Sequence, residues 1–461
     1  MRINSDYKIS DVLNLVIIAL LVFSCQNNDN NNPDRITLRN AALKQIQAPK
    51  IPVNTISLIE FGASGDSVTD CKPAFDKAIK ECSTKKNLRL VVSPGIYFIK
   101  GPLHLKSNIC IELKKGARLK FSSEPNDYLP VVLTSWEGTF LYNYSPFIYG
   151  YQLENLSIIG DGVIDGNASE TFNTWKEFQN EGQQKSRDMN HQNVPVEKRI
   201  FGKGYYLRPQ FIQFFECKNI LIEGVHITNS PFWCIHLLKS ENVTVRKISF
   251  NAKNTNNDGI DPEYSKNILI EDVEFNNGDD NVAIKAGRDH EGRNTAIPSE
   301  NIIIRNCKFK GLHGVVIGSE MSAGVQNVFV ENCSFGGYCK RGIYLKSNPD
   351  RGGFIRNIFV NNVKFGEVED AFYITSFYHG EGKGFETDIQ KVYVDSFYCH
   401  KANNAGIVIE GFPTKKVKNI SFSNFQIDSV NVAVSINNAE NISMSNVNIG
   451  GIVKGMPSFA K

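Results

Sequence analysis

A turn residue, usually Asn, followed by an alternating apolar run recurs through most of this chain of 461 residues. Examples of the run are KNILIEGVHI, ENVTVRKISF, KNILIEDVEF and ENIIIRNCKF. The turn residues follow one another at intervals of 22 to 34 residues, and they are Asn219, Asn242, Asn267, Asn301, Asn327, Asn357, Lys391, Asn419 and Asn441. Alternation indicates short strands rather than helices, and self-similarity at such an interval indicates a solenoid. We therefore predict an all-β fold, a right-handed parallel β-helix in which each coil covers its neighbour.

The repeated Asn residues and three Cys residues suggest how the coils stack. Asn tolerates the left-handed backbone conformation of tight turns, and its side chain can hydrogen-bond along the stack. Cys217, Cys307 and Cys333 occupy equivalent positions in the repeat, where we expect free thiols packed as small core residues. The alternative is a disulfide, because the chain has ten Cys residues and an export-like N-terminus. No CxxC, HxH or HExxH spacing is present, so we expect neither a metal nor another cofactor.

Residues 51–461 are predicted to form one elongated domain, which grows by adding coils. Near its start, FGASGDSVTDCKPAFDKAIKEC predicts an amphipathic helix from the spacing of Ala74, Phe75, Ala78, Ile79 and Cys82. We expect this helix to cap the first coil, because an open end would expose unpaired backbone and apolar interior. LRLVVSPGIYFI and ICIELKKGARLKF are interpreted as early strands. The aromatic-rich, irregular region between about residues 128 and 208 is expected to wall one side of a groove.

The first 50 residues differ from the repeat. Arg2 and Lys8 precede an apolar run, Val12 to Phe23, that is too short to span a membrane comfortably. The run ends in VFSC, which resembles a bacterial lipoprotein signal with residues 1–24 removed and Cys25 acylated. Residues 25–50 would then be a polar tether, and Gln after the Cys favours the outer membrane of a two-membraned bacterium, on either face. An ordinary cleaved signal peptide is the alternative.

The charge pattern gives no sign of a nucleic-acid partner. The formal net charge is +3, and removal of residues 1–24 leaves it at +3 because that segment holds two basic and two acidic residues. Nucleic-acid binding calls for a concentrated basic face, whereas here basic and acidic residues alternate along the chain. We therefore expect no nucleic acid among the partners, and no segment indicates oligomerisation, so we expect a monomer.

Three carboxylates lie in NTNNDGIDPE and NNGDDNVAIK. Asp258 and Asp279 are 21 residues apart, close to one repeat, so they should stack on neighbouring coils together with Asp280. His313 and Lys346 follow downstream. Cleavage of a glycosidic bond needs one carboxylic acid to protonate the leaving oxygen and another to activate water. Crowding should raise the pKa of one of the three acids.

These segments, in their order, resemble a known family. GDGVIDGN, NNDGIDPE, NNGDDNVAIKAG, HGVVIGSE and the strand RGIYLKS are similar to glycoside hydrolase family 28, the polygalacturonase family. The resemblance covers roughly Phe61 to Asn448. It implies a right-handed parallel β-helix that hydrolyses α-linked galacturonides with inversion, so the expected partner is an acidic plant polysaccharide of the pectin type.

The resemblance also implies roles for individual residues. Asp279 matches the family's general acid, while Asp258 and Asp280 match the pair that holds and deprotonates the attacking water. His313 matches the histidine that orients the acid pair, although Leu312 precedes it where the family has a small residue. Adjacent residues of a regular strand point to opposite faces, so Asp279 and Asp280 can both serve only if the backbone turns there.

The substrate-binding residues depart from the family pattern. The family carries an arginine two residues before Lys346, but this chain has Tyr344, which shares the strand face with Lys346. We expect Tyr344 to stack on a neutral or differently substituted sugar, as in rhamnogalacturonan. Arg341 lies three residues before Tyr344, and we do not expect it simply to take the place of the missing guanidinium. Lys285 either faces the cleft or lies on the surface, and Asp261 is assigned a structural turn before Pro.

Other functions stay open at this stage. The segment IGSEMSAG and the aromatic N-terminal region resemble exo-acting bacterial members, with loops around Trp136 and Lys176 closing one end of the groove. A pectate-lyase-like enzyme is one alternative, with the aspartates as calcium ligands. A non-catalytic glycan-binding solenoid is another.

Overall fold

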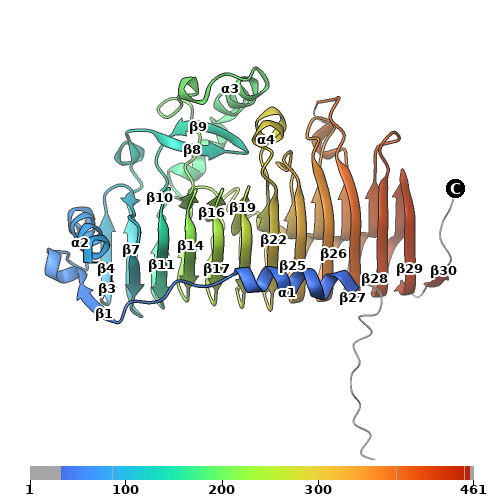
Figure 1. Ribbon diagram of the computed structural model, residues 1–461, viewed down its shortest axis with the longest axis horizontal. Helices are drawn as coiled ribbons and strands as arrows, with labels where there is room; N and C mark the ends of the chain where they lie inside the picture. Colours follow the sequence, from blue (N-terminus) through green and yellow to red (C-terminus); the bar gives the residue numbers. More distant parts are fainter. Residues whose placement is uncertain (1–32, 86, 381, 451, 457–461) are drawn as a thin grey trace, which may run out of the picture.

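The chain folds into a right-handed parallel β-helix, as predicted. A computed structural model describes residues 33–85, 87–380, 382–450 and 452–456. Its parallel strands stand side by side along the long axis of the molecule (Figure 1). Successive coils pair in register, so that Ile220, Val243, Ile268 and Ile302 are neighbours on four consecutive coils. One inward column of apolar side chains thus runs from coil to coil.

Each early coil contributes three short strands. The strands that start at the Asn-led turns are β1 (Asn54–Ser57), β3 (Leu88–Val92), β6 (Cys110–Leu113), β11 (Glu154–Gly160), β14 (Lys218–Glu223), β17 (Glu241–Arg246), β20 (Lys266–Glu271) and β22 (Ser299–Arg305). The second face consists of β2 (Asp66–Asp70), β4 (Gly95–Ile99), β7 (Ala117–Phe121), β12 (Val163–Asp165), β15 (His226–Thr228), β18 (Ser249–Asn251) and β23 (Lys308–Phe309). The third, which we call the groove face, consists of β5 (Leu103–His104), β10 (Ile148–Tyr151), β13 (Ile212–Phe215), β16 (Ile235–Leu238), β19 (Ile260–Glu263), β21 (Asp280–Ile284) and β24 (His313–Ile317).

The later coils consist of long strands that continue around the corners. They are β25 (Val325–Lys346), β26 (Phe354–Thr375), β27 (Asp388–Glu410), β28 (Val417–Asn437) and β29 (Ala439–Ile449), followed by β30 (Ile452–Met456). The last parts of β25 to β28 extend the groove face beyond β24.

The predicted turns are confirmed. All nine turn residues have φ between 54° and 58°, the left-handed conformation that Asn tolerates best. Their side chains bond from coil to coil: Asn242 to Asn219 at 2.6 Å, Asn327 to Asn301 at 3.0 Å and Asn441 to Asn419 at 3.2 Å. The Asn column therefore satisfies its own polar groups while it fixes the stacking register.

Aromatic rings and free thiols fill the interior. Seven Phe rings stack face to face with centroids 3.9–5.1 Å apart, in the order Phe250, Phe275, Phe309, Phe335, Phe365, Phe397 and Phe425. Cys217, Cys307 and Cys333 are buried, and all nine cysteines of the described residues are free. The disulfide alternative does not apply to these cysteines.

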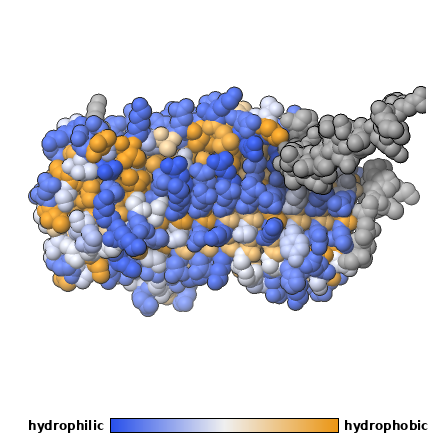
Figure 2. Space-filling model, turned by 90° about the horizontal axis from the view of Figure 1, so that it is seen from below, coloured by the Kyte–Doolittle hydropathy of each residue, from blue (hydrophilic) through white to orange (hydrophobic). Residues whose placement is uncertain are grey.

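Two helices cover the outside of the solenoid. The predicted cap is α2 (Lys72–Lys85), which buries all five of the apolar residues expected to do so. The second is α1 (Pro33–Gln45), which lies lengthwise along several coils (Figure 1). Seen from below, the surface has large hydrophilic areas, hydrophobic patches toward the left end and the upper part, and a narrow hydrophobic stripe along part of the long axis (Figure 2).

Helix α1 corrects the expectation of a polar tether over residues 25–50. Ala42 is buried against Leu269, Ile303, Phe329 and Phe359, which face outward from the sheet. Arg35 and Arg39 in addition pair with Glu331 at 3.2 Å. Helix α1 buries these outward apolar side chains of four coils, which would otherwise be exposed to water. Residues 1–32, with the expected lipoprotein signal and Cys25, lie outside the described residues, and no described helix is long and apolar enough to cross a membrane.

The irregular region expected to wall a groove forms a separate layer. It contains the antiparallel hairpin β8 (Val132–Trp136) and β9 (Thr139–Asn143), and the helix α3 (Asn180–His191). Both lie on the same side of the solenoid as α4 (Asp289–Thr295) (Figure 1). A cluster of buried apolar side chains, including Trp136, Phe232 and Trp233, joins this layer to the coil before β16.

The Phe column yields a stability prediction. We expect Phe335→Ala to destabilise the fold by about 3–5 kcal/mol, because the substitution leaves a cavity between two stacked rings. Tyr338→Ala, at a position 52% exposed on the same strand, should change stability by less than about 0.5 kcal/mol. Urea unfolding followed by tryptophan fluorescence measures both, and equal effects would contradict the account.

Candidate active site

The β-helix register brings the predicted acids together. Asp258 immediately precedes the coil of β19, and Asp280 opens β21 on the next coil. Asp280 pairs in register with His313, which in turn pairs with Arg341 in β25. Asp280, His313 and Arg341, which are far apart in sequence, therefore form a row across three successive coils of the groove face.

The backbone turns before β21, as the sequence requires. Asp279 lies in a bend, and the strand begins at Asp280. The side chain of Asp279 is 23% exposed and accepts a hydrogen bond from Asn256 at 3.1 Å, whereas that of Asp280 is 2% exposed. Asp279 therefore reaches toward the solvent side of the groove, while Asp280 lies beneath it.

Asp280 has two close cationic or hydrogen-bonding partners. The Nδ1 atom of His313 lies 2.6 Å from one carboxylate oxygen, and Lys346 Nζ lies 3.0 Å from the other. Burial alone would raise the pKa of Asp280, but Lys346 and His313 outweigh burial and hold this pKa below its usual value. Asp280 is thus ionised and able to accept a proton.

The neighbouring acids behave in the opposite way. Burial, reinforced by the charge of Asp280, raises the pKa of Asp279. Burial, reinforced by Asp261, also raises the pKa of Asp258 well above its usual value. The expected raised pKa is found at Asp279 and also at Asp258, but burial contributes more to it than the crowding of the acids. Adjacent carboxyls with opposite shifts form an acid and base pair.

Asp261 was assigned to a turn, and that assignment is wrong. It lies inside β19, fully buried, with its carboxylate 4.0 Å from Lys285 Nζ. Burial raises its pKa as well. The following Pro262 does not end the strand, because in register it faces the solenoid interior beside Leu237.

Lys285 faces the cleft rather than the outer surface. Its ammonium lies 3.7 Å from Asp258, 3.4 Å from Glu320 and 4.4 Å from the centre of the Trp233 ring. Burial alone would lower the pKa of Lys285, but Glu320 and Asp258 outweigh burial and raise it. Lys285 therefore carries a permanent positive charge beneath the acids.

Sequence reasoning missed a group of buried charges beside the acids. Glu320 accepts from Arg288 at 3.2 Å and from Ser319 at 2.9 Å, and Arg351 donates from its Nε to the backbone oxygen of Ser319 at 2.7 Å. Glu320 lies in the IGSE segment that the family resemblance had drawn attention to. Nothing in the sequence pattern brings Arg288 or Arg351 to it, because both lie in loops.

These residues line a cavity of about 210 Å³. Its wall has six basic side chains and five acidic ones, and the lining residues are Glu137, Lys176, Gln183, Arg187, Trp233, Asn256, Asp258, Asp279, Asp280, Lys285, Arg288, Ser319, Glu320, Lys346, Arg351, Tyr378 and His379. Lys176, as predicted, lines the cavity, whereas Trp136 lies buried in the supporting cluster. A basic wall around paired acids suits an anionic sugar.

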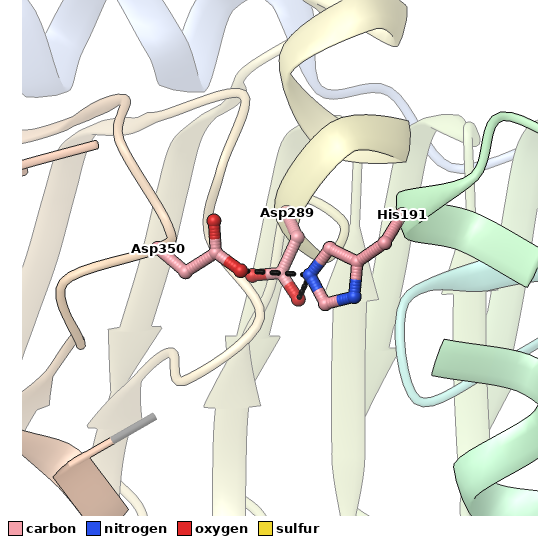
Figure 3. Close-up of side chains that lie close together, drawn as sticks. All are labelled: His191, Asp289 and Asp350. Atoms are coloured by element: carbon pink, nitrogen blue, oxygen red, sulfur yellow. Dashed lines mark hydrogen bonds and ion pairs between the residues drawn. The ribbon is translucent and has the colours of Figure 1, made fainter. Parts of the chain in front are cut away.

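Helix α3 is fixed across one side of this cavity. Gln183 and Arg187 line it, and Gln183 donates to Glu137 at 2.8 Å. At the other end of the helix, His191 lies 2.7 Å from Asp350 and 3.4 Å from Asp289 (Figure 3). The contacts join α3 to α4 and to the loop after β25, so three separate segments hold the wall in place.

Among the described residues, two clusters have ligand atoms close enough for a metal ion, and basic side chains already pair with an acid in each. Asp279, Asp280 and His313 form one cluster, but Lys346 binds Asp280. His191, Asp289 and Asp350 form the other, where Asp289 is paired with Arg288 and Arg351. A metal would have to displace these side chains, so the donor sets do not fit a resident ion.

Tyr344 is placed differently from the expectation. It is 3% exposed and is enclosed by Tyr373 and Tyr378, with ring centroids 5.4 and 6.3 Å away. The guanidinium of Arg341 lies 4.7 Å from the centre of the Tyr344 ring. A buried ring cannot stack on a sugar, so the stacking interpretation is wrong, and Arg341 covers the ring instead.

Comparisons with known proteins agree with the fold and identify the family. The sequence model described as "Glycosyl hydrolases family 28" matches residues 82–454. The crystal structure of a hyperthermoactive exopolygalacturonase from Thermotoga maritima is 39% identical, covers 91% of this chain and 97% of its own, and superposes with a TM-score of 0.87. An endo-polygalacturonase of Pectobacterium parmentieri is 28% identical over 84% of this chain and 92% of its own length. A probable polygalacturonase of Vitis vinifera is 29% identical over 81% and 74%.

A β-helix with paired acids in a basic cavity defines a glycan-cleaving enzyme. The chain belongs to glycosyl hydrolase family 28, and it is therefore a glycoside hydrolase rather than a lyase or a non-catalytic glycan-binding solenoid.

The Asp280 environment predicts a pH effect. Asp280 must be ionised to act as a base, and His313 helps to keep its pKa low, so His313→Ala should raise that pKa. As the pH is lowered, the variant should then lose activity earlier than the wild type. The acidic limb of its kcat/KM profile should shift to higher pH by about 1 pH unit or more. His226→Ala, on the second face, is the control, and an unmoved limb in His313→Ala would refute the assignment.

Proposed function

We propose that this glycoside hydrolase cleaves α-galacturonosidic linkages of pectin by inversion and removes units from chain ends. The observation that carries the proposal is the opposite pKa shift of two adjacent carboxyls, Asp279 and Asp280, at the bottom of a basic cavity. The names of the relatives agree with the substrate, since they include polygalacturonases and exopolygalacturonases.

Each acid has a role that follows from its environment. Asp279, whose pKa is raised by burial and by Asp280 and whose side chain is accessible from the cavity, donates a proton to the leaving glycosidic oxygen. Asp280, ionised and fixed by His313, takes the proton from the attacking water. Asp258, held by Lys285 at 3.7 Å, positions that water and donates a hydrogen bond to it.

The basic side chains supply substrate recognition. A galacturonide has one carboxylate on every sugar, and Arg and Lys bind carboxylates through charge-assisted hydrogen bonds. Lys346 is shared between Asp280 and the cavity, so it links the substrate carboxylate to the base. Lys176 and Arg187 come from the α3 side and face the same space.

Action at chain ends follows from the α3 wall. In an open groove a long polymer lies across many coils, but here α3 and the hairpin β8–β9 stand over the earlier coils (Figure 1). The substrate polymer can then extend from the cavity in one direction only, over β24 and the later strands. One terminal sugar enters the closed side at each turnover.

The activity test uses the purified protein and Asp279→Asn on homogalacturonan and rhamnogalacturonan oligosaccharides labelled at the reducing end. We expect monogalacturonate as the first product from homogalacturonan, no ultraviolet-absorbing unsaturated product, and no effect of chelator. Asp279→Asn should lower kcat by about 100-fold or more, because general acid catalysis is lost.

Other outcomes of this test are distinct. A mixture of long oligomers early in the reaction would refute end-acting hydrolysis while it preserved hydrolysis. An unsaturated product that vanishes with chelator would indicate lyase chemistry. Cleavage confined to rhamnogalacturonan would contradict the proposed substrate but not the proposed hydrolytic mechanism.

We also propose that Cys25 carries a lipid and anchors the enzyme to the outer membrane. Support comes from the VFSC sequence and from α1. Only seven residues lie between Cys25 and Pro33, so the eight Cα-to-Cα steps of the link span at most about 29 Å. Helix α1 lies on the side opposite α3 and α4 (Figure 1), and the cavity would therefore face away from the membrane.

The anchor predicts a clear change in localisation. Cys25→Ser should abolish incorporation of labelled palmitate and move the protein from the membrane to the soluble fraction, with kcat/KM unchanged. Gln26→Ser serves as the control. An unlabelled wild-type protein, cut at an ordinary signal peptidase site, would refute the anchor.

A further inference from the structure

We infer that Glu137 determines which chain ends the enzyme accepts, because its carboxylate accepts a hydrogen bond from the free C4 hydroxyl of the non-reducing terminal sugar. The inference rests on the proposed removal of galacturonate from chain ends and deepens it. The enzyme then acts on ends that carry this hydroxyl. It discriminates against ends made by elimination, which have a C4–C5 double bond in its place.

Glu137 occupies a position that its backbone geometry disfavours. Glu137 and Gly138 form the two-residue turn between β8 and β9, and their φ angles are 45° and 80°. A hairpin turn with both φ values positive favours Asn, Asp or Gly at its first position, because other side chains are strained there. Strain of this kind is typical of residues that contact a ligand. Glu137 lines the cavity, so a ligand there is within its reach.

The turn is held rigidly over the groove face. Ser135 donates to Glu263 at the end of β19 at 3.2 Å. At the tip, the backbone N–H of Arg288 donates to the oxygen of Gly138 at 3.0 Å. A Cβ atom on Gly138 would lie only 2.7 Å from that nitrogen, so the tip is in tight contact with the loop after β21. The carboxylate of Glu137 is therefore preorganised before a substrate arrives.

One carboxylate oxygen of Glu137 already has partners, and the other is available. The Oε2 atom accepts from Gln183 at 2.8 Å and from Arg187 at 3.4 Å, both on α3. Among the described residues, none donates a hydrogen bond to Oε1, and the side chain is 17% exposed. A carboxylate oxygen has two acceptor positions and no donor. The available oxygen thus requires an O–H or N–H donor from the ligand.

The acids determine which end of the polymer lies beside the hairpin. In an inverting hydrolysis, water attacks the anomeric carbon from the side opposite the leaving oxygen. Asp258, which positions that water, precedes β19, whereas the acid Asp279 precedes β21 on the next coil. The leaving chain therefore lies over the later coils, and the attacked sugar lies toward the hairpin. A terminal sugar that is attacked at its anomeric carbon is the non-reducing end.

A carboxylate on the hairpin side selects the hydroxyl edge of that sugar. Glu137 attracts O–H donors and repels the carboxylate of a galacturonate, so the sugar enters with its own carboxylate turned away from Glu137. In homogalacturonan the C4 oxygen of every interior sugar forms a glycosidic bond, and only the terminal sugar has a free hydroxyl there. Glu137 therefore recognises the group that marks a saturated chain end. Hydrolysis supplies such ends, whereas elimination does not.

The experiment compares three trisaccharides. They are trigalacturonate, its analogue deoxygenated at C4 of the non-reducing sugar, and the unsaturated trisaccharide made by elimination. The variants are Glu137→Gln, Glu137→Ala and Glu137→Asn, with Glu112→Ala as a matched control. Glu112 is 15% exposed and pairs with Arg89 at 2.9 Å, but it lies in β6, outside the cavity. We measure kcat and KM for each, and calorimetry measures binding in the Asp279→Asn background with and without Glu137→Ala.

The expected result is the loss of one preference. The wild type should prefer trigalacturonate over both analogues by about 10- to 100-fold in kcat/KM, as for a hydrogen bond to a charged group. Glu137→Ala should lower kcat/KM for trigalacturonate by a similar factor and change it for the analogues by less than about 2-fold. Glu137→Gln keeps an acceptor oxygen and should retain part of the preference. Glu112→Ala should behave as the wild type.

Glu137→Asn separates a role in binding from a role in folding. Asn tolerates a positive φ, so the melting temperature should stay the same or rise. Its side chain is shorter by one methylene, which withdraws the oxygen from the substrate, so the preference for the hydroxyl should be lost. A residue that served only the hairpin would show the reverse, namely a changed melting temperature and an unchanged preference.

Two results would overturn the inference while galacturonide hydrolysis stands. One is a wild type that cleaves and binds the two analogues as well as it does trigalacturonate. The other is a preference for the hydroxyl that persists in Glu137→Ala. Absence of turnover with every galacturonide would instead refute the proposed function. The calorimetry needs no turnover, so it would still show whether Glu137 recognises the hydroxyl.

Discussion

In-register hydrogen bonding between parallel coils is the constraint on which the rest of the structure depends. Each strand pairs with the same positions of the next coil, so a side chain is carried one strand spacing along the axis with its direction preserved. The row Asp280, His313 and Arg341 exists for this reason. A shift of one residue in any coil would turn the row away from the groove. The Asn column at the turns stabilises this register by hydrogen bonds between coils, and the Phe column stabilises it by ring stacking in the interior.

The chemistry of the site depends on how four neighbouring aspartates share the nearby lysine charges. Asp258, Asp261, Asp279 and Asp280 share two lysines, Lys285 and Lys346. Proximity to these charges decides which acid ionises most readily. Lys346 at 3.0 Å and His313 at 2.6 Å hold the pKa of Asp280 low, while His313 is farther from Asp279, at 3.9 Å, and burial raises the pKa of that carboxyl. Acid and base therefore differ through their neighbours, although they are adjacent in sequence.

Sequence reasoning succeeded where a pattern is local and failed where a partner comes from a distant loop. The repeat predicted the strands, the turns and the α2 cap, and its interval placed the acids on adjacent coils. The helix α1 was missed because its apolar residues are few and its neighbours are polar, and only the outward Phe329 and Phe359 explain its docking. Asp261 was misassigned because a following Pro usually ends a strand, and here the strand continues.

The sequence by itself determined the β-helix, the stacking interval and the acids at the cleavage point, because these depend on periodicity and on residue type. Only the tertiary structure decided the α3 wall of the cavity, the Glu320 cluster and the relation of Arg341 to Tyr344. Each of these joins loops or coils through side chains that no periodic rule relates. The role of Tyr344 changed for the same reason: strand alternation shows which face a residue occupies, whereas burial depends on what covers that face.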